Sequence, residues 1–104
     1  CHRDTNYGGA LLPHDEVGTE SSLANGTARG TGQYRIPNLL DVGNNAPYLH
    51  NGSVPSLNAL LSSERLAPDY VGAHGRIGAV PGHLYGTSLT AAERQALIAF
   101  LQTL

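Results

Sequence analysis

The chain has 104 residues, six arginines, eight acidic residues and no lysine, which give a formal net charge of −2. A chain of this length forms one small domain, residues 1–104, and such domains often depend on a cofactor, a metal or a disulfide for stability. The only cysteine is Cys1, so a disulfide within the chain is excluded. The charge argues against a nucleic-acid surface, and no apolar run approaches the ~20 residues that cross a bilayer.

Thirteen glycines and six prolines predict many turns and loops in this chain. The small, polar segment 19–31 is expected to be a surface loop. A short helical turn is compatible with residues 36–40, after Pro37. A longer helix is predicted over 55–62, with Ser53 as its N-cap, because proline is tolerated in a first turn and serine is a favoured cap.

The second half of the chain contains one long loop and one well-marked helix. Residues 71–86 carry five glycines and Pro81, which predict a loop, and loops on a rigid scaffold often hold ligands. Thr90 and Glu93 have the spacing of a capping box, and the apolar residues after them recur at helical spacing. A helix is therefore predicted over 91–103. No segment shows the sustained alternation that is typical of half-buried strands.

The dipeptide Cys1-His2 has the residue types that end the haem c attachment signature, C-x-x-C-H. A chain cut inside this signature would begin in this way, whereas the alternative is a frayed terminus with no role. The chain also opens without an initiator methionine. Its start is therefore expected to be processed or truncated, with an export signal lost upstream.

Residues 32–61, GQYRIPNLLDVGNNAPYLHNGSVPSLNALL, hold two motifs in close succession. The first is an Arg-x-Pro-x-Leu run, made by Arg35, Pro37 and Leu39. The second is the block A-P-Y-x-H-N-G-S at 46–53. Together they resemble the C-terminal haem domain of the bacterial di-haem cytochrome c peroxidase superfamily.

The resemblance extends over essentially the whole chain. His14-Asp15 with Val17-Gly18-Thr19 is similar to the family's H-D-x-G-T element with Glu16 inserted, and residues 89–104 are similar to its closing helix. Two sequences are most similar to the rubber-oxygenase-like branch of this superfamily. They are Y-L-H-N-G-S-V-P-S-L and the later G-H-L-Y-G-T, from Gly82 to Thr87. The chain departs from the family pattern at the haem signature, because the first of its two cysteines is absent from the sequence. That cysteine either lies upstream of Cys1 or is missing.

The resemblance implies an all-α, cytochrome c-like domain with few short helices and long loops around one haem c. It implies a C-terminal piece of a larger di-haem oxidoreductase, which passes electrons to or from a second haem in an N-terminal haem domain or a redox partner. Whether this chain is itself an enzyme stays open. The expected location is periplasmic or secreted, in a bacterium.

The resemblance also assigns residues to the haem. Cys1 would attach it and His2 would bind the iron. The chain has no methionine, so a methionine ligand from within it is excluded, and His83 of the G-H-x-Y-G-T motif is the expected sixth ligand. His74 is held in reserve, and His50 is placed near the haem but off the iron.

Further residues are expected around the haem. Arg35 would pair a haem propionate, because a guanidinium offers a planar fork to a carboxylate. Pro37, Leu39 and Tyr48 are expected beside the haem. The resemblance also implies a calcium ion at the carbonyl groups of Asn45 and Pro47, and calcium accepts backbone oxygens readily.

Two other functions stay open at this point. The iron could have an open face that reacts with peroxide or oxygen, with His50 nearby as acid or base. Alternatively, the chain could be a binding module without haem, in which Cys1 is incidental.

Overall fold

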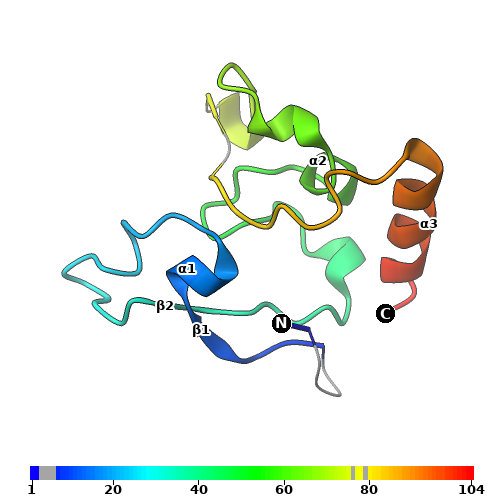
Figure 1. Cartoon of the computed structure of the whole chain (residues 1–104). Coiled ribbons are helices and arrows are strands. Elements are labelled where there is room, and N and C mark those ends of the chain that lie inside the picture. The colour runs from blue at the N-terminus through cyan, green and yellow to red at the C-terminus, as the bar shows by residue number, and fades with distance from the viewer. Residues whose placement is uncertain (3–6, 76, 79) are drawn as a thin grey trace. The chain divides into compact units, whose positions relative to one another are not determined.

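A computed structural model describes residues 1–2, 7–75, 77–78 and 80–104 (Figure 1). The chain divides into two compact units. Unit 1 comprises Cys1–Leu40 and Pro81–His83, and unit 2 comprises Asp41–Val80 and Leu84–Leu104. No helix among the described residues has the length and apolar character needed to cross a membrane.

Unit 1 is built on a short antiparallel strand pair. Strand β1 (Leu11–Pro13) pairs with β2 (Gln33–Arg35), with Leu12 opposite Tyr34. Helix α1 (His14–Val17) follows β1 without a linker, and the two lie together in Figure 1. The proline at the end of β1 lacks an N–H, which suits the end of a strand.

Tyr34 is the largest buried apolar side chain of unit 1 among the described residues. Its hydroxyl donates to Glu20 Oε1 (2.9 Å), and the guanidinium of Arg29 lies 5.3 Å from its ring centroid. Burial first, and then the hydrogen bond with Glu20, raise the pKa of Tyr34. The middle of β2 is therefore tied to the loop 19–31 by polar contacts as well as by burial.

Unit 2 contains short helices around an apolar core. Its regular elements are the 3₁₀ turns η1 (Val42–Asn44), η2 (Ser63–Leu66) and η3 (Ala73–Gly75), and the helices α2 (Leu57–Leu60) and α3 (Ala91–Leu101). The core consists of Val42, Tyr48, Val54, Leu57 and Leu61. Tyr48 and Val54 form an isolated antiparallel bridge, and the Tyr48 hydroxyl donates to the carbonyl oxygen of Val42 (2.7 Å). Helices α2 and α3 contact each other.

The prediction of an all-α fold is wrong, because β1 and β2 form a two-stranded sheet. Each strand has only three residues, which is too short for alternation to be visible in the sequence. Residues 36–40 are not helical. Instead, the backbone N–H of Ile36 donates to Ala10 (2.8 Å), which continues the pairing beyond β2. The fold is small and mixed, with short helices and long connecting loops.

The predicted helix over 55–62 is present only as α2, and its cap was misplaced. Ser56 is the N-cap, since its hydroxyl accepts the N–H of Ala59 (3.1 Å). Ser53 is instead buried, and its hydroxyl accepts the N–H of Val80 (3.3 Å). The closing helix is confirmed as α3, with the Thr90 and Glu93 capping box in place, although it ends at Leu101.

Candidate haem site

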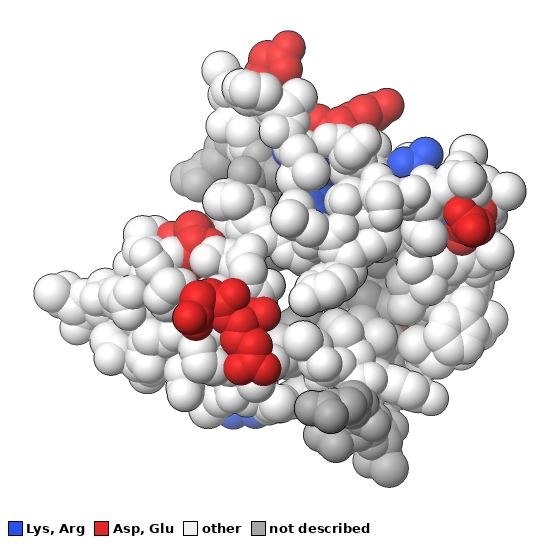
Figure 2. Space-filling model, in the orientation of Figure 1, with Lys and Arg blue, Asp and Glu red and all other residues white. Residues whose placement is uncertain are grey.

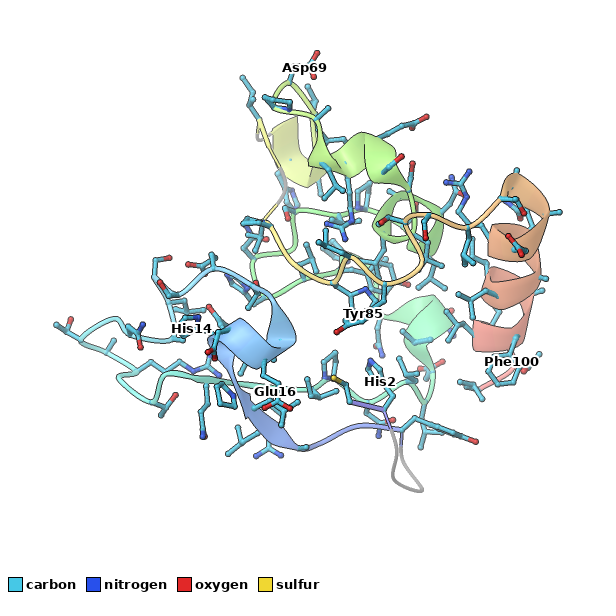
Figure 3. The ribbon with its side chains drawn as sticks, viewed as in Figure 1. His2, His14, Glu16, Asp69, Tyr85 and Phe100 are labelled. Carbon is cyan, nitrogen blue, oxygen red and sulfur yellow. The ribbon has the colours of Figure 1, made fainter. Side chains whose placement is uncertain are left out.

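The two histidines that the resemblance assigns to the iron lie together in unit 1. The ring centroids of His2 and His83 are 6.4 Å apart, and the ring planes make an angle of 64°. His2 lies in the N-terminal segment, beside the only cysteine (Figure 3). His83 ends the segment Pro81–His83, which is the part of the 71–86 loop that belongs to unit 1.

His2 is oriented by a backbone contact. Its Nδ1 lies 2.7 Å from the carbonyl oxygen of Tyr7. A carbonyl can only accept, so Nδ1 carries the proton in this contact and Nε2 is left with its lone pair. Metal-binding histidines usually donate their other ring N–H to a carbonyl or carboxylate in this way, which fixes both tautomer and ring orientation.

The distance between the two rings fits a metal held between them. Imidazole nitrogens bind a metal such as zinc at ~2.0–2.1 Å, so two rings on opposite sides of one metal ion have centroids about 6 Å apart. Each ring can turn about its own metal–nitrogen bond, so the angle between the planes is not restricted. His83 is half-buried, with its Nδ1 shielded from solvent. The spacing of His2 and His83 therefore fits two histidine ligands on one metal ion, such as a haem iron.

Arg35 lies in the same unit, at the end of β2. Its side chain is exposed, and Nη1 donates to the carbonyl oxygen of Gly9 (2.7 Å). A guanidinium has further N–H donors, so this bond does not prevent it from pairing a carboxylate. Pro37 is exposed and Leu39 is half-buried.

The other predicted site residues belong to unit 2. Tyr48 is part of the core, while His50 is exposed. His74 is exposed too and has a left-handed backbone conformation (φ 63°) within η3. Asn45 and Pro47, the predicted calcium ligands, are both exposed. The roles of these residues stay predictions.

Acidic side chains gather over α1, as Figure 2 shows where that helix lies in Figure 1. Asp15 and Glu16 are the exposed acidic residues of α1, and Figure 3 shows Glu16 on the helix with His14. The surface of unit 1 near this helix is therefore negative.

One family model matches part of the chain. The family is described as RoxA-like, cytochrome c-like, and the match covers residues 33–70. These residues include β2 and the whole A-P-Y-x-H-N-G-S block. The match supports a cytochrome c-like domain related to rubber oxygenase, which agrees with that part of the resemblance. No curated protein and no solved structure matches the chain.

Two features of the site were missed in the sequence. The carbonyl of Tyr7 could not be predicted as a partner of His2, because every residue carries a carbonyl. Thr19 was noticed only as part of the H-D-x-G-T element, but its hydroxyl donates to the carbonyl oxygen of Pro81 (2.9 Å). The H-D-x-G-T element was the signal that could have indicated this bond, because it places the hydroxyl of Thr19 directly after the end of a helix.

Proposed function

We propose that this chain binds one haem c and transfers electrons through it. Cys1 would form a thioether to the porphyrin, and His2 and His83 would be the axial ligands. The observation that carries the proposal is the pairing of the two imidazoles at 6.4 Å, with His2 oriented by Tyr7. The family match to a cytochrome c-like domain supports it independently.

The haem supplies a one-electron couple between ferric and ferrous iron. The chain's own contribution would be to bind the iron through His2 and His83, which would leave no open site for peroxide or oxygen. Two histidines also favour the ferric state more than a histidine and methionine pair would. Arg35 would pair a propionate and fix the edge of the ring. These properties suit a haem that passes electrons on, rather than one that reacts with peroxide or oxygen.

We further propose that the chain is the C-terminal part of a di-haem oxidoreductase, and that it exchanges electrons with a second haem in an N-terminal domain or a redox partner. The A-P-Y-x-H-N-G-S block and the G-H-L-Y-G-T motif support this placement through their similarity to that superfamily. A periplasmic or secreted location follows from the same similarity, because c-type haem domains are typically found outside the cytoplasm. Calcium at Asn45 and Pro47 rests on the similarity alone.

The proposal is tested by the visible spectrum of the chain and of His83→Ala. The chain should be red, with an intense Soret band, and acid–acetone extraction should leave the colour with the protein. His83→Ala should change a low-spin spectrum to a high-spin one and allow cyanide and carbon monoxide to bind. His74→Ala is the matched control and should stay low-spin.

Three outcomes would contradict parts of this proposal. A colourless protein would contradict haem binding and would favour the alternative of a binding module without haem. A high-spin spectrum in the unmodified chain would indicate an open iron that reacts with peroxide or oxygen. A low-spin spectrum that survives His83→Ala would assign the sixth position to another residue, with His74 and then His50 as the next candidates.

A further inference from the structure

The segment that carries His83 is held against the end of α1. The Thr19 hydroxyl donates to the carbonyl oxygen of Pro81 (2.9 Å). Gly82 is buried, and a Cβ at this position would lie 2.8 Å from the carbonyl oxygen of Gly18 and 2.9 Å from Thr19 Cβ. Real Cβ atoms do not come so close to backbone, so only glycine allows this approach. Thr19 and Gly82 therefore fix the backbone on the N-terminal side of His83.

Thr19 is itself held in place by the way α1 ends. Gly18 caps the helix in a left-handed conformation (φ 74°), and its N–H donates to the carbonyl oxygen of His14. The N–H of Thr19 donates to the same oxygen (3.0 Å). This arrangement is a common helix terminus, in which a left-handed glycine turns the chain and satisfies free carbonyls. The hydroxyl of Thr19 is thus presented from a defined position.

His83 needs this support because its backbone is strained. It has a φ of 49°, in the left-handed region that residues other than glycine rarely adopt. Such conformations persist where the surrounding structure determines them, and they are frequent at ligand sites. In this segment the supporting contacts include the Thr19 hydroxyl bond to Pro81 and the close packing of Gly82.

We infer that Thr19 is a positioning residue for the iron ligand His83. Its hydroxyl bond to Pro81 holds the 81–83 segment so that the imidazole stays opposite His2. This inference rests on the proposed function, since it concerns the same ligand. Without the bond, the segment spends more time displaced, and the sixth coordination position of the iron opens more often.

The test compares Thr19→Val, which removes the hydroxyl and keeps the shape, with Thr19→Ser, which keeps the hydroxyl. In a six-coordinate ferrous haem, carbon monoxide binds only when a ligand leaves, so its binding rate reports how often His83 is displaced. One net hydrogen bond corresponds to a change of about fivefold in an equilibrium. We expect Thr19→Val to bind carbon monoxide about fivefold faster, and Thr19→Ser to be close to the unmodified chain.

Two controls separate positioning from general loosening. Thr27→Val makes the same substitution at an exposed threonine of unit 1 and should leave the rate unchanged. Gly82→Ala should raise the rate beyond Thr19→Val, because the new methyl group pushes the segment off α1. Its control is Gly9→Ala, which also has a positive φ (97°, against 134° for Gly82) but open space around the added Cβ. Gly9→Ala should change the rate less.

The outcomes keep the two proposals distinct. If the unmodified chain is low-spin and His83→Ala opens it, but Thr19→Val binds carbon monoxide at the unmodified rate, the positioning role is wrong and the proposed function stands. Equal rates for Thr19→Val and Thr27→Val would also overturn it. If His83→Ala leaves the iron closed, His83 is not the ligand, and both the assignment and the positioning role fail together.

Discussion

The two units differ in the number of apolar residues in their buried cores. Of the eight buried apolar residues among those described, five belong to unit 2 and only three, Ala24, Tyr34 and Ile36, belong to unit 1. Unit 2 also contains the longest helix, α3. Unit 1 has two three-residue strands and a single turn of α-helix. Large apolar side chains are exposed in both units, such as Leu11 in unit 1 and Phe100 in unit 2, so the units differ in their buried cores and not in their exposed apolar residues.

The paired histidines lie in the unit with the smaller core. A unit with little buried apolar surface gains most from a ligand that binds only its folded form. A haem held by His2 and His83 would supply both apolar area and a link between the N-terminal segment and Pro81–His83. We therefore expect unit 2 to be stabilised by its own packing and unit 1 to depend on the haem that we propose for it.

The largest effect is expected on removing the cofactor, for which we compare the haem-loaded chain with Cys1→Ser after haem extraction. Backbone hydrogen exchange should become much faster at the N–H groups of Gly9 and Ile36, which donate within unit 1. The N–H groups of Leu60 and Leu61, which donate within unit 2, should keep most of their protection. Equal loss in both units would show that the haem stabilises them alike and would break the comparison.

The second effect concerns the core of unit 2. Leu61 is 4% exposed, and its Cδ2 lies 2.7 Å from where a Cβ on Gly86 would be, so its surroundings are tightly filled. Leu61→Ala should lower the free energy of unfolding by about 2–5 kcal/mol, because a buried leucine leaves a cavity. Chemical denaturation measures the loss. Leu11→Ala is the control, since Leu11 is 53% exposed, and it should cost far less.

Features that depend on neighbouring residues could be predicted from the sequence. The capping box of Thr90 and Glu93 is visible as a spacing of three residues, and α3 begins where it indicates. The loop character of 19–31 follows in the same way from its small, polar residues. The N-cap of α2 was placed at Ser53 because Pro55 is tolerated in a first helical turn. In the structure Ser56 caps the helix by accepting from Ala59, and Ser53 accepts the N–H of Val80 instead.

Features that depend on distant residues could not be predicted by pattern. The partners β1 and β2 are separated by the whole 19–31 loop, and neither is long enough to show alternation. His2 and His83 are 81 positions apart, and only the family resemblance suggested that they belong to one site. The hydrogen bonds to the Tyr7 and Pro81 carbonyls could not be predicted from residue types, because every residue has a backbone carbonyl.

The third prediction sharpens the role of unit 1 in holding the haem. Arg35→Leu should lower the midpoint potential by a few tens of millivolts, because removing a nearby positive charge favours ferric iron, and it should weaken haem retention. Charge-assisted hydrogen bonds contribute about 1.5–3 kcal/mol each. Redox titration measures the shift. Arg29→Leu changes the net charge of unit 1 equally but acts at Tyr34, so an equal shift in both variants would place Arg35 away from the propionates.

The smallest effect compares one buried tyrosine from each unit. Tyr34 donates to Glu20, a carboxylate, whereas Tyr48 donates to the buried carbonyl of Val42. Tyr48→Phe leaves that carbonyl without its donor and should cost about 1–3 kcal/mol of unfolding free energy near neutral pH. Tyr34→Phe should cost only about 0.5–1.5 kcal/mol, because the Glu20 carboxylate also accepts from the N–H of Ser22.

The pH dependence of these two losses gives the sharper test. Burial raises the pKa of both hydroxyls in the folded chain, and Glu20 raises that of Tyr34 further. Above about pH 10 the unfolded tyrosine releases its proton while the folded one keeps it, so each tyrosine's stabilisation is complete below pH 10 and is lost as pH rises through the folded pKa. The deficit of each phenylalanine variant relative to the unmodified chain should therefore shrink above pH 10. Denaturation at pH 7, 9, 10 and 11 measures it, and a deficit that stays constant would mean that neither hydroxyl is held in its protonated form by its unit.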